Sequence, residues 1–179
     1  MADAPSSVAS SLAERIRNVP DFPIPGILFR DITTLLKDAE ALRTAVDAMI
    51  EPFRGDRIDL VVGVESRGFI FATPVAYALK AGFAPVRKLG RLPSDAIRIE
   101  YELEYGTNTL ELHRDAVQPG QRVLVVDDLL ATGGTAAAAV DLVNQLGGDV
   151  IGLSFLVELR DLRGRERLAH ERVHAVVQY

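Results

Sequence analysis

Two adjacent acids and a glycine–threonine loop follow the most apolar strand-like run of the chain. Asp127 and Asp128 come directly after residues 122–126, and Ala131–Thr135 leads into a helical pattern. In open parallel sheets, ligands bind beyond the carboxyl ends of the strands. Free N–H groups at a helix start, two glycines that let backbone approach an anion, and two threonine hydroxyls together make a cradle for one phosphate.

The two acids limit what else this segment could bind. A pair of carboxylates beside a phosphate cradle repels a bare polyphosphate, but it accepts hydrogen bonds from neutral hydroxyls and could lie near a metal ion. A ribose 5-phosphate fits both parts of the segment. Its 2′,3′-diol would bind to the acids, and its 5′-phosphate, one sugar length away, would bind to the loop. The segment has neither the lysine of a P-loop nor the G-x-G-x-x-G spacing of a dinucleotide-binding loop. The alternative is an ordinary strand–turn–helix with acidic loop residues.

Basic residues gather at two other places. Arg67 precedes a helix-like stretch, while Arg87, Lys88 and Arg91 form a cluster in a segment with little periodicity. Each group could bind a small phosphate ligand or could be solvated surface charge. The three histidines are scattered along the chain and suggest neither a catalytic triad nor a metal cluster.

Strand-like and helix-like patterns alternate along the chain. This alternation predicts a doubly wound α/β fold with a mostly parallel sheet, in a single domain of residues 1–179. The expected strands are residues 58–64, 83–86, 122–126, 150–157 and 174–177. The expected helices between them are residues 68–81 and 135–146.

The N-terminal part is expected to form a small cover of about residues 1–34. Ser11–Glu14 has the S-x-x-E capping-box pattern, and apolar residues at helical spacing follow up to Pro20, which predicts a helix there. Three prolines within Pro20–Gly26 then predict an ordered, extended loop. Asp38 is placed to cap the next helix.

A second segment outside the alternation is an insertion. Residues 97–105 alternate apolar and polar side chains, which predicts a half-buried strand that turns into residues 109–113 as a hairpin. The surrounding stretch of about residues 87–113 is expected to be a flexible catalytic loop, mobile without ligand and closing during turnover.

Composition excludes several classes of protein. The 179 residues fit one domain, and the absence of cysteine excludes disulfides, thiolate metal sites and a cysteine nucleophile. The net charge of −5 gives no footprint for nucleic acid. Because no apolar run approaches about 18 residues and the start lacks the pattern of a secretory signal, we expect no membrane span and a cytoplasmic location.

At this point a family resemblance is plain. Residues 123–135 resemble the phosphoribosyl-pyrophosphate signature of type I phosphoribosyltransferases, and further stretches resemble the adenine phosphoribosyltransferases in consistent order from about residue 12 to Tyr179. These stretches are residues 21–26, 29–32, 65–69, 87–93, 103–106, 157–159 and 164–166. The resemblance implies the type I fold and the reaction of adenine with phosphoribosyl pyrophosphate to give AMP and pyrophosphate. It also implies Mg²⁺ held mainly by the substrate, and a homodimer.

The resemblance assigns roles to single residues as well. Asp127 and Asp128 would hold the ribose hydroxyls. The catalytic residues would be Glu104, Arg67 and Tyr105. The 5′-phosphate would be wrapped by Ala131, Thr132, Gly133, Gly134 and Thr135. The pyrophosphate would be bound by Ser66, Arg67, Arg87, Lys88 and Arg91, some of them from across a dimer interface. The adenine would be bordered by Leu28, Phe29, Arg30 and Leu159.

The residues by themselves do not decide the roles of Glu104 and Arg91. Periodicity does not distinguish Glu104 from Glu100 and Glu102, and only the family's catalytic loop favours Glu104 as the group that exchanges a proton with the purine. The family often has lysine where this chain has Arg91, which keeps the charge but changes the donor geometry.

Two alternative functions stay open at this stage. A regulator with the same fold would bind the ligand without turnover, but it would need an effector domain for which the N-terminal segment is too short. Within the enzyme class, xanthine or guanine could replace adenine as the acceptor. Incubation with each base in turn would separate all of these possibilities.

Overall fold

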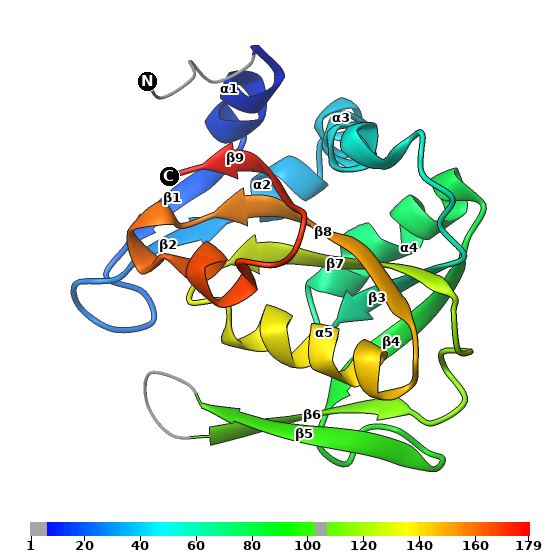
Figure 1. Ribbon diagram of the computed structural model, residues 1–179. Coiled ribbons are helices and arrows are strands. Elements are labelled where there is room, and N and C mark those ends of the chain that lie inside the picture. The colour runs from blue at the N-terminus through cyan, green and yellow to red at the C-terminus, as the bar shows by residue number, and fades with distance from the viewer. Residues whose placement is uncertain (1–6, 103–106) are drawn as a thin grey trace. The chain divides into compact units, whose positions relative to one another are not determined.

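The computed structural model describes residues 7–102 and 107–179 of the chain, which form two compact units (Figure 1). The first unit ends at Ala48 and the second runs from Met49 to Tyr179, so the division falls inside helix α3 (Ala39–Ile50). Among the described residues, no helix has the length and apolar character needed to cross a membrane.

The first unit is built around a two-stranded antiparallel ribbon. Strand β1 (Arg17–Pro20) pairs with β2 (Leu28–Asp31), and the loop between them contains the predicted proline-rich segment. Arg17 forms an ion pair with Asp31, and hydrogen bonding from its guanidinium lowers the pKa of that carboxyl to about 2. The ribbon is preceded by helix α1 (Ser7–Glu14) and followed by α2 (Thr33–Leu36) and α3.

Helix α3 begins where the sequence predicted. Oδ1 of Asp38 accepts the backbone N–H groups of Glu40 and Ala41, each at 3.1 Å. These bonds satisfy two of the donors that a helix start leaves without intrahelical partners. The predicted capping role of Asp38 is confirmed.

The predicted helix that reaches Pro20 is wrong in its bounds. Helix α1 already begins at Ser7 and ends at Glu14, and the chain then becomes extended as β1. A proline disfavours helical backbone in the residue before it, and here that residue is Val19, which pairs with Phe29 of the ribbon. The helix-like apolar spacing up to Pro20 therefore comes partly from α1 and partly from β1.

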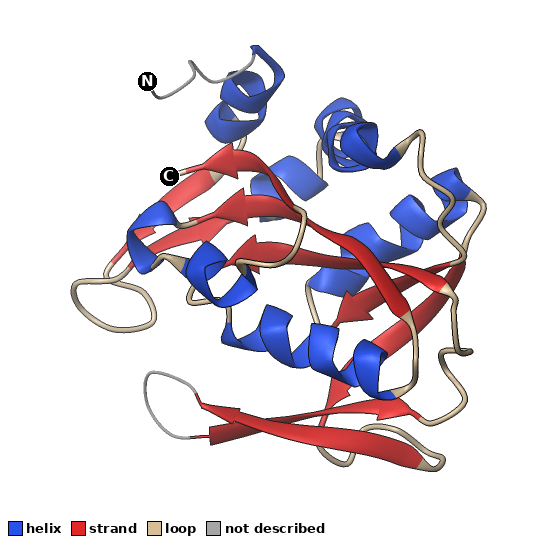
Figure 2. Ribbon diagram, viewed as in Figure 1, coloured by secondary structure: helices blue, strands red, loops and turns tan. Residues whose placement is uncertain are grey.

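The second unit contains a seven-stranded sheet between two helices (Figure 2). Its strands follow the order β5-β6-β4-β3-β7-β8-β9, in which the last five are parallel and the first two form an antiparallel hairpin. The strands are β3 (Leu60–Val64), β4 (Gly82–Lys88), β5 (Ala96–Glu102), β6 (Thr107–His113), β7 (Arg122–Leu130), β8 (Asp149–Glu158) and β9 (Val173–Gln178). The helices are α4 (Gly68–Leu79) and α5 (Gly134–Gln145), with single 3₁₀ turns at η1 (Glu51–Phe53), η2 (Arg160–Leu162) and η3 (Gly164–Leu168).

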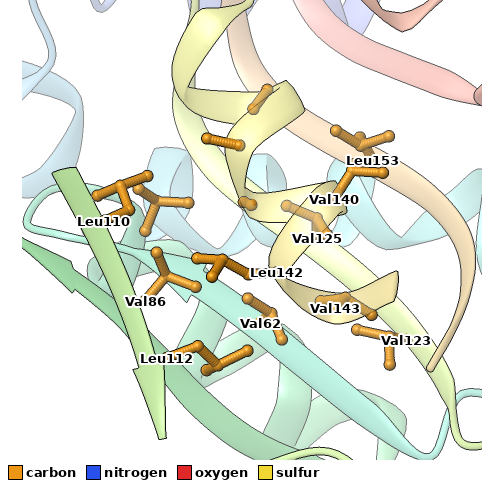
Figure 3. Close-up of a cluster of buried hydrophobic side chains, with 14 of the residues drawn as sticks. Val62, Val86, Leu110, Leu112, Val123, Val125, Val140, Leu142, Val143 and Leu153 are labelled. Carbon is orange, nitrogen blue, oxygen red and sulfur yellow. The ribbon is translucent and has the colours of Figure 1, made fainter. Parts of the chain in front are cut away.

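Strand β3 is buried on both faces, as its continuous apolar run predicted. Val62 belongs to the cluster that packs the sheet against α5, together with Val125 and Leu142 (Figure 3). The opposite face meets α4, because a Cβ built on Gly63 would lie only 2.6 Å from the Cβ of Ala72. The two helices therefore cover opposite faces, and the predicted doubly wound arrangement is confirmed.

Strand β7 is longer than predicted, since it continues four residues beyond Val126. Asp127 is paired with Phe155 of β8, and Leu130 is paired with Glu158. The long partner strand β8 supplies hydrogen-bonding positions all along this extension. As a result, the two acids lie within the sheet and not beyond its edge.

The predicted hairpin is present as β5 and β6, which extend from the sheet along one side of α5 (Figure 1). Ile99 lies opposite Leu110 in the antiparallel register. The proposed catalytic residues Glu104 and Tyr105 lie outside the described residues.

Candidate active site

The carboxyl ends of β3 and β7 border a cavity of about 220 Å³. Its lining residues come from the segment after β3, from the last residues of β7, from the loop that follows and from the first turn of α5. They are Glu65, Ser66, Arg67 and residues 127–136. The structure therefore brings together the acid pair, the glycine–threonine loop and two of the residues expected to bind pyrophosphate.

The acid pair is held at the base of this cavity. Asp128 is only 5% exposed, and its Oδ2 lies 2.9 Å from Nε of Arg67. Oδ1 of Asp127 accepts the backbone N–H of Asp128 at 2.8 Å. A Cβ at Gly68 would lie 2.6 Å from the same oxygen, so a larger residue at the start of α4 would displace the carboxylate.

Burial shifts the titration of both acids. Loss of solvation raises the pKa of Asp127 well above its ordinary range, and the neighbouring Asp128 carboxylate raises it further. Burial also raises the pKa of Asp128, although the guanidinium of Arg67 opposes that shift. The pair is therefore short of positive charge and hydrogen-bond donors, which a ligand with hydroxyl groups or cationic character would supply.

The glycine–threonine loop, residues 131–135, depends on close backbone packing. Gly133 has a φ of +82°, and a Cβ at this position would lie 2.4 Å from the carbonyl oxygen of Gly164. Only glycine suits both the left-handed backbone and the contact. Helix α5 starts at the next residue, so the first-turn N–H groups, which have no intrahelical acceptor, are available to an anion in the cavity.

The basic cluster is organised around a carboxylate to which the sequence assigned no role. The carboxylate of Glu65 accepts hydrogen bonds from Nε of Arg87 at 3.1 Å and from the backbone N–H of Lys88 at 3.0 Å. Hydrogen bonding from Arg87 lowers the pKa of Glu65. Arg87 also donates to the backbone oxygen of Arg91 at 3.2 Å.

Within the described chain, Arg87, Lys88 and Arg91 do not line the cavity. Their assignment to the pyrophosphate stays a prediction. Glu65 could have been found by its place in a stretch that the family resemblance already included.

The residues expected to border the base are divided between the two units. Leu28, Phe29 and Arg30 form most of β2, where Leu28 is 46% exposed and Phe29 packs edge-on against Phe22. Leu159 belongs to the other unit, and its backbone N–H donates to the oxygen of Leu130 at 2.9 Å. Their joint contact with one base stays a prediction.

An ion pair between the buried Glu158 and the partly exposed Arg165 was also missed. Glu158 is 4% exposed and receives Nε and Nη2 of Arg165, at 2.7 and 2.8 Å, together with the amide of Gln178 at 3.0 Å. The neighbouring Gly164 packs so closely that a Cβ there would lie 2.3 Å from the oxygen of Ala131. The pair thus fixes the turn that supports the glycine–threonine loop.

An acid pair and an anion-binding loop at the ends of parallel strands define a phosphoribosyltransferase, and residues 33–177 match the family described as a phosphoribosyl transferase domain. The chain is 57% identical over 169 residues to the adenine phosphoribosyltransferase of Clostridium perfringens, which covers 94% of this chain and 98% of that protein. It therefore belongs to the adenine phosphoribosyltransferase family, and the resemblance found in the sequence is confirmed.

Other relatives agree over nearly the whole chain. The adenine phosphoribosyltransferase of Thermobifida fusca is 57% identical over 172 residues, or 96% of this chain and 98% of that protein. The crystal structure of the Rhodothermus marinus enzyme is 52% identical with a TM-score of 0.93, covering 97% of this chain and 99% of that one. The Saccharomyces cerevisiae structure is 39% identical with a TM-score of 0.90, covering 96% and 99%. The predicted type I fold is thus confirmed.

Proposed function

We propose that this chain transfers the 5-phosphoribosyl group of phosphoribosyl pyrophosphate to adenine, forming AMP and pyrophosphate in purine salvage. The observation that carries the proposal is one cavity lined by both the acid pair and the glycine–threonine loop, in a chain that is 57% identical to an adenine phosphoribosyltransferase. The yeast relative was crystallised with adenine and an imino-altritol bisphosphate, which supports a purine and a phosphorylated sugar analogue as ligands.

The acid pair has two tasks in this reaction. Cleavage at the anomeric carbon builds positive charge on the ribose and negative charge on the departing pyrophosphate. Asp127 and Asp128 accept hydrogen bonds from the ribose hydroxyls, and their negative field favours the cationic sugar in the transition state. The ribose hydroxyls in turn supply the donors that the buried acids lack.

The leaving group is received at the other side of the cavity. Ser66 and Arg67 stand at the start of α4, where backbone N–H groups and the positive end of the helix favour an anion. Arg67 pairs with Asp128 and so connects the pyrophosphate side to the ribose side. Arg87, Lys88 and Arg91 add positive charge to the same reaction, in part from a second subunit.

Magnesium fits this donor set as an ion carried by the substrate. Among the described residues, no group of three or more histidine or carboxylate side chains could hold a metal ion by itself. Asp127 and Asp128 could contribute carboxylate oxygens, and most of the coordination would come from the pyrophosphate oxygens and water. When bound, the ion neutralises charge on the leaving pyrophosphate.

Glu104 carries the proton transfer in this proposal, and Tyr105 is the next residue in the sequence. A carboxylate at this position would exchange a proton with the purine imidazole ring as N9 attacks the ribose. Positioned proton transfer is worth about 10²–10⁴ in rate, so Glu104→Gln should lower kcat by that factor with little change in either KM. Glu100→Gln is the matched control and should leave kcat unchanged. A Glu104→Gln enzyme within about threefold of wild type would remove Glu104 from the mechanism.

A homodimer completes the proposal. Ile70 on α4 is 42% exposed, and Phe83 on β4 is also exposed although it packs edge-on against Phe69. These side chains supply part of an apolar surface that a second copy of the chain would cover. Sedimentation equilibrium should give twice the mass of the chain, and a monomer that retains full activity would contradict the dimer. The cytoplasmic location stays a prediction.

The direct test is an assay with phosphoribosyl pyrophosphate, Mg²⁺ and one base at a time. We expect adenine to be used far better than hypoxanthine, guanine or xanthine, because a site built for a 6-amino donor leaves polar groups unpaired when a 6-oxo base enters. Such mismatches reach about 10⁴ in kcat/KM. A comparable kcat/KM for hypoxanthine would reject adenine specificity, and binding without nucleotide formation would favour the regulator.

A further inference from the structure

The hairpin contacts the proposed 5′-phosphate site through one side chain. The hydroxyl of Tyr101, on β5, lies 3.1 Å from Oγ1 of Thr135 in the first turn of α5. Both side chains are partly buried, and the ring of Tyr101 packs against the same apolar cluster as α5. Figure 1 shows β5 running beside this helix, so the contact joins two elements that already lie together.

The direction of this hydrogen bond depends on what occupies the site. A threonine hydroxyl has one proton to donate and two lone pairs that accept. Without ligand, either Tyr101 or Thr135 can be the donor. A phosphate oxygen only accepts, so Thr135 must give its proton to a bound phosphate and must then take its own hydrogen bond from another donor. The phenol of Tyr101 is that donor.

We propose that Tyr101 is a positioning residue of the 5′-phosphate site: its hydroxyl donates to Oγ1 of Thr135 and so directs the threonine proton at the phosphate. Chains of hydrogen bonds polarise one another, so the bond from Thr135 to the phosphate is stronger when Tyr101 completes the chain. The inference rests on the proposed function, because it requires that Thr135 bind the 5′-phosphate.

If the Tyr101–Thr135 hydrogen bond were merely structural, its loss would have different consequences. If the contact served only to fasten β5 to α5, its loss would weaken every ligand of the cavity or lower the melting temperature. If it positions Thr135, its loss weakens only ligands that carry a 5′-phosphate. Ribose 5-phosphate and inorganic pyrophosphate separate these two cases, because pyrophosphate would bind on the Ser66–Arg67 side.

The experiment compares Tyr101→Phe with Thr135→Val, with the double variant, and with Tyr77→Phe. Tyr77 is 87% exposed and loses the same hydroxyl, so it is the matched control. For Tyr101→Phe we expect the Kd for ribose 5-phosphate and the KM for phosphoribosyl pyrophosphate to rise about threefold to tenfold, the range for one neutral hydrogen bond. The Kd for Mg-pyrophosphate, kcat and the melting temperature should change little. Tyr77→Phe should match the wild type.

The double variant supplies the decisive measurement. Tyr101→Phe should cost nothing further in the Thr135→Val background, but should keep its full effect beside Thr135→Ser, which retains the hydroxyl. Additive losses with Thr135→Val, or an equal loss of pyrophosphate affinity, would overturn the positioning role. If Thr135→Val weakens ribose 5-phosphate and Tyr101→Phe does not, only this inference fails. If Thr135→Val has no effect on ribose 5-phosphate, the proposed phosphate site fails with it.

Discussion

Two buried acidic groups lie on neighbouring strands, and their partners are very different. In the part of the chain that the structure describes, Asp128 on β7 pairs with the guanidinium of Arg67, and Asp127 accepts the backbone N–H of Asp128. On β8, Glu158 alone receives two donors of Arg165 and the amide of Gln178. Burial without sufficient donors is costly, whereas a carboxylate with matched donors can be accommodated. The comparison indicates that the acid pair on β7 is suited to bind a ligand, whereas Glu158 on β8 stabilises the fold.

The largest expected effect is the loss of activity when the acid pair on β7 is neutralised. In the proposed mechanism, Asp127→Asn combined with Asp128→Asn removes the negative field that would stabilise a cationic ribose, so kcat/KM should fall by roughly 10³ or more. The fold should persist, because both amides match the shape of the acids and relieve their burial. Steady-state kinetics and circular dichroism would measure the two properties. A folded double variant with wild-type kcat/KM would mean that the pair is not part of the reaction.

An intermediate effect is expected when the satisfied pair on β8 is broken. Arg165→Met leaves Glu158 buried with one remaining donor, and removal of one partner from a buried pair costs about 3–5 kcal/mol. Because the Arg165 side chain is partly exposed, we expect a loss nearer 2–3 kcal/mol, measured by denaturant unfolding. Arg163→Met is the control, since Arg163 and Glu166 are both exposed and 3.9 Å apart. Replacing Glu158 by Leu as well should restore most of the lost free energy of unfolding. If it does not, the two side chains contribute more to the fold than the neutralisation of each other.

The smallest expected effect is a higher free energy of unfolding when Asp127 alone is replaced by asparagine. The pKa of Asp127 is raised in the folded state. Below the unfolded pKa of about 3.9, the carboxyl is protonated in both states and does not lower the free energy of unfolding. As pH rises from there through the folded pKa, ionisation favours the unfolded state and lowers the free energy of unfolding. Asp127→Asn should therefore stabilise the ligand-free protein at pH 7.5, by about 1 kcal/mol, and not at pH 4. Unfolding by denaturant at both values measures the difference.

The exposed Asp95, which pairs with Arg114 on the surface, gives the control for that gain. Asp95→Asn should stay within about 0.5 kcal/mol of the wild type at either pH. Should Asp127→Asn destabilise the protein at pH 7.5, the acid would contribute to the fold, and the contrast with Glu158 would disappear.

Most of the sheet could be predicted, because local patterns specify it. Residues 58–64 and 150–157 are nearly continuous apolar runs, interrupted by Asp59 and Ser154, and such runs are typical of a strand covered on both faces. The glycine–threonine loop could be found as well, since its residue types are dictated by backbone approach and a helix start. The family resemblance then added roles that periodicity alone left open, above all that of Glu104.

Other features depend on partners that are remote in sequence. Whether β7 stops at Val126 or continues to Leu130 is decided by the length of β8, not by the acids themselves. The bonds of Glu65 to Arg87 and of Glu158 to Arg165 join strand ends and turns that become neighbours only in the folded sheet. At β1, the proline was visible in the sequence, but the pairing of this segment with β2 was not.

The continuation of β7 through both acids bears on how readily their backbone amides exchange with solvent. Amide protons in a central strand exchange with deuterium only when a large cooperative unit of the protein unfolds, whereas those of loops exchange through local fluctuations. The backbone of Asp127 is paired with Phe155 of β8, while the pairing of β7 with β3 ends at Val126, so its amide should exchange more slowly than that of Thr132 in the loop. The two acids, which we propose to bind the ribose, would then be in place as soon as the sheet has formed, before any substrate arrives.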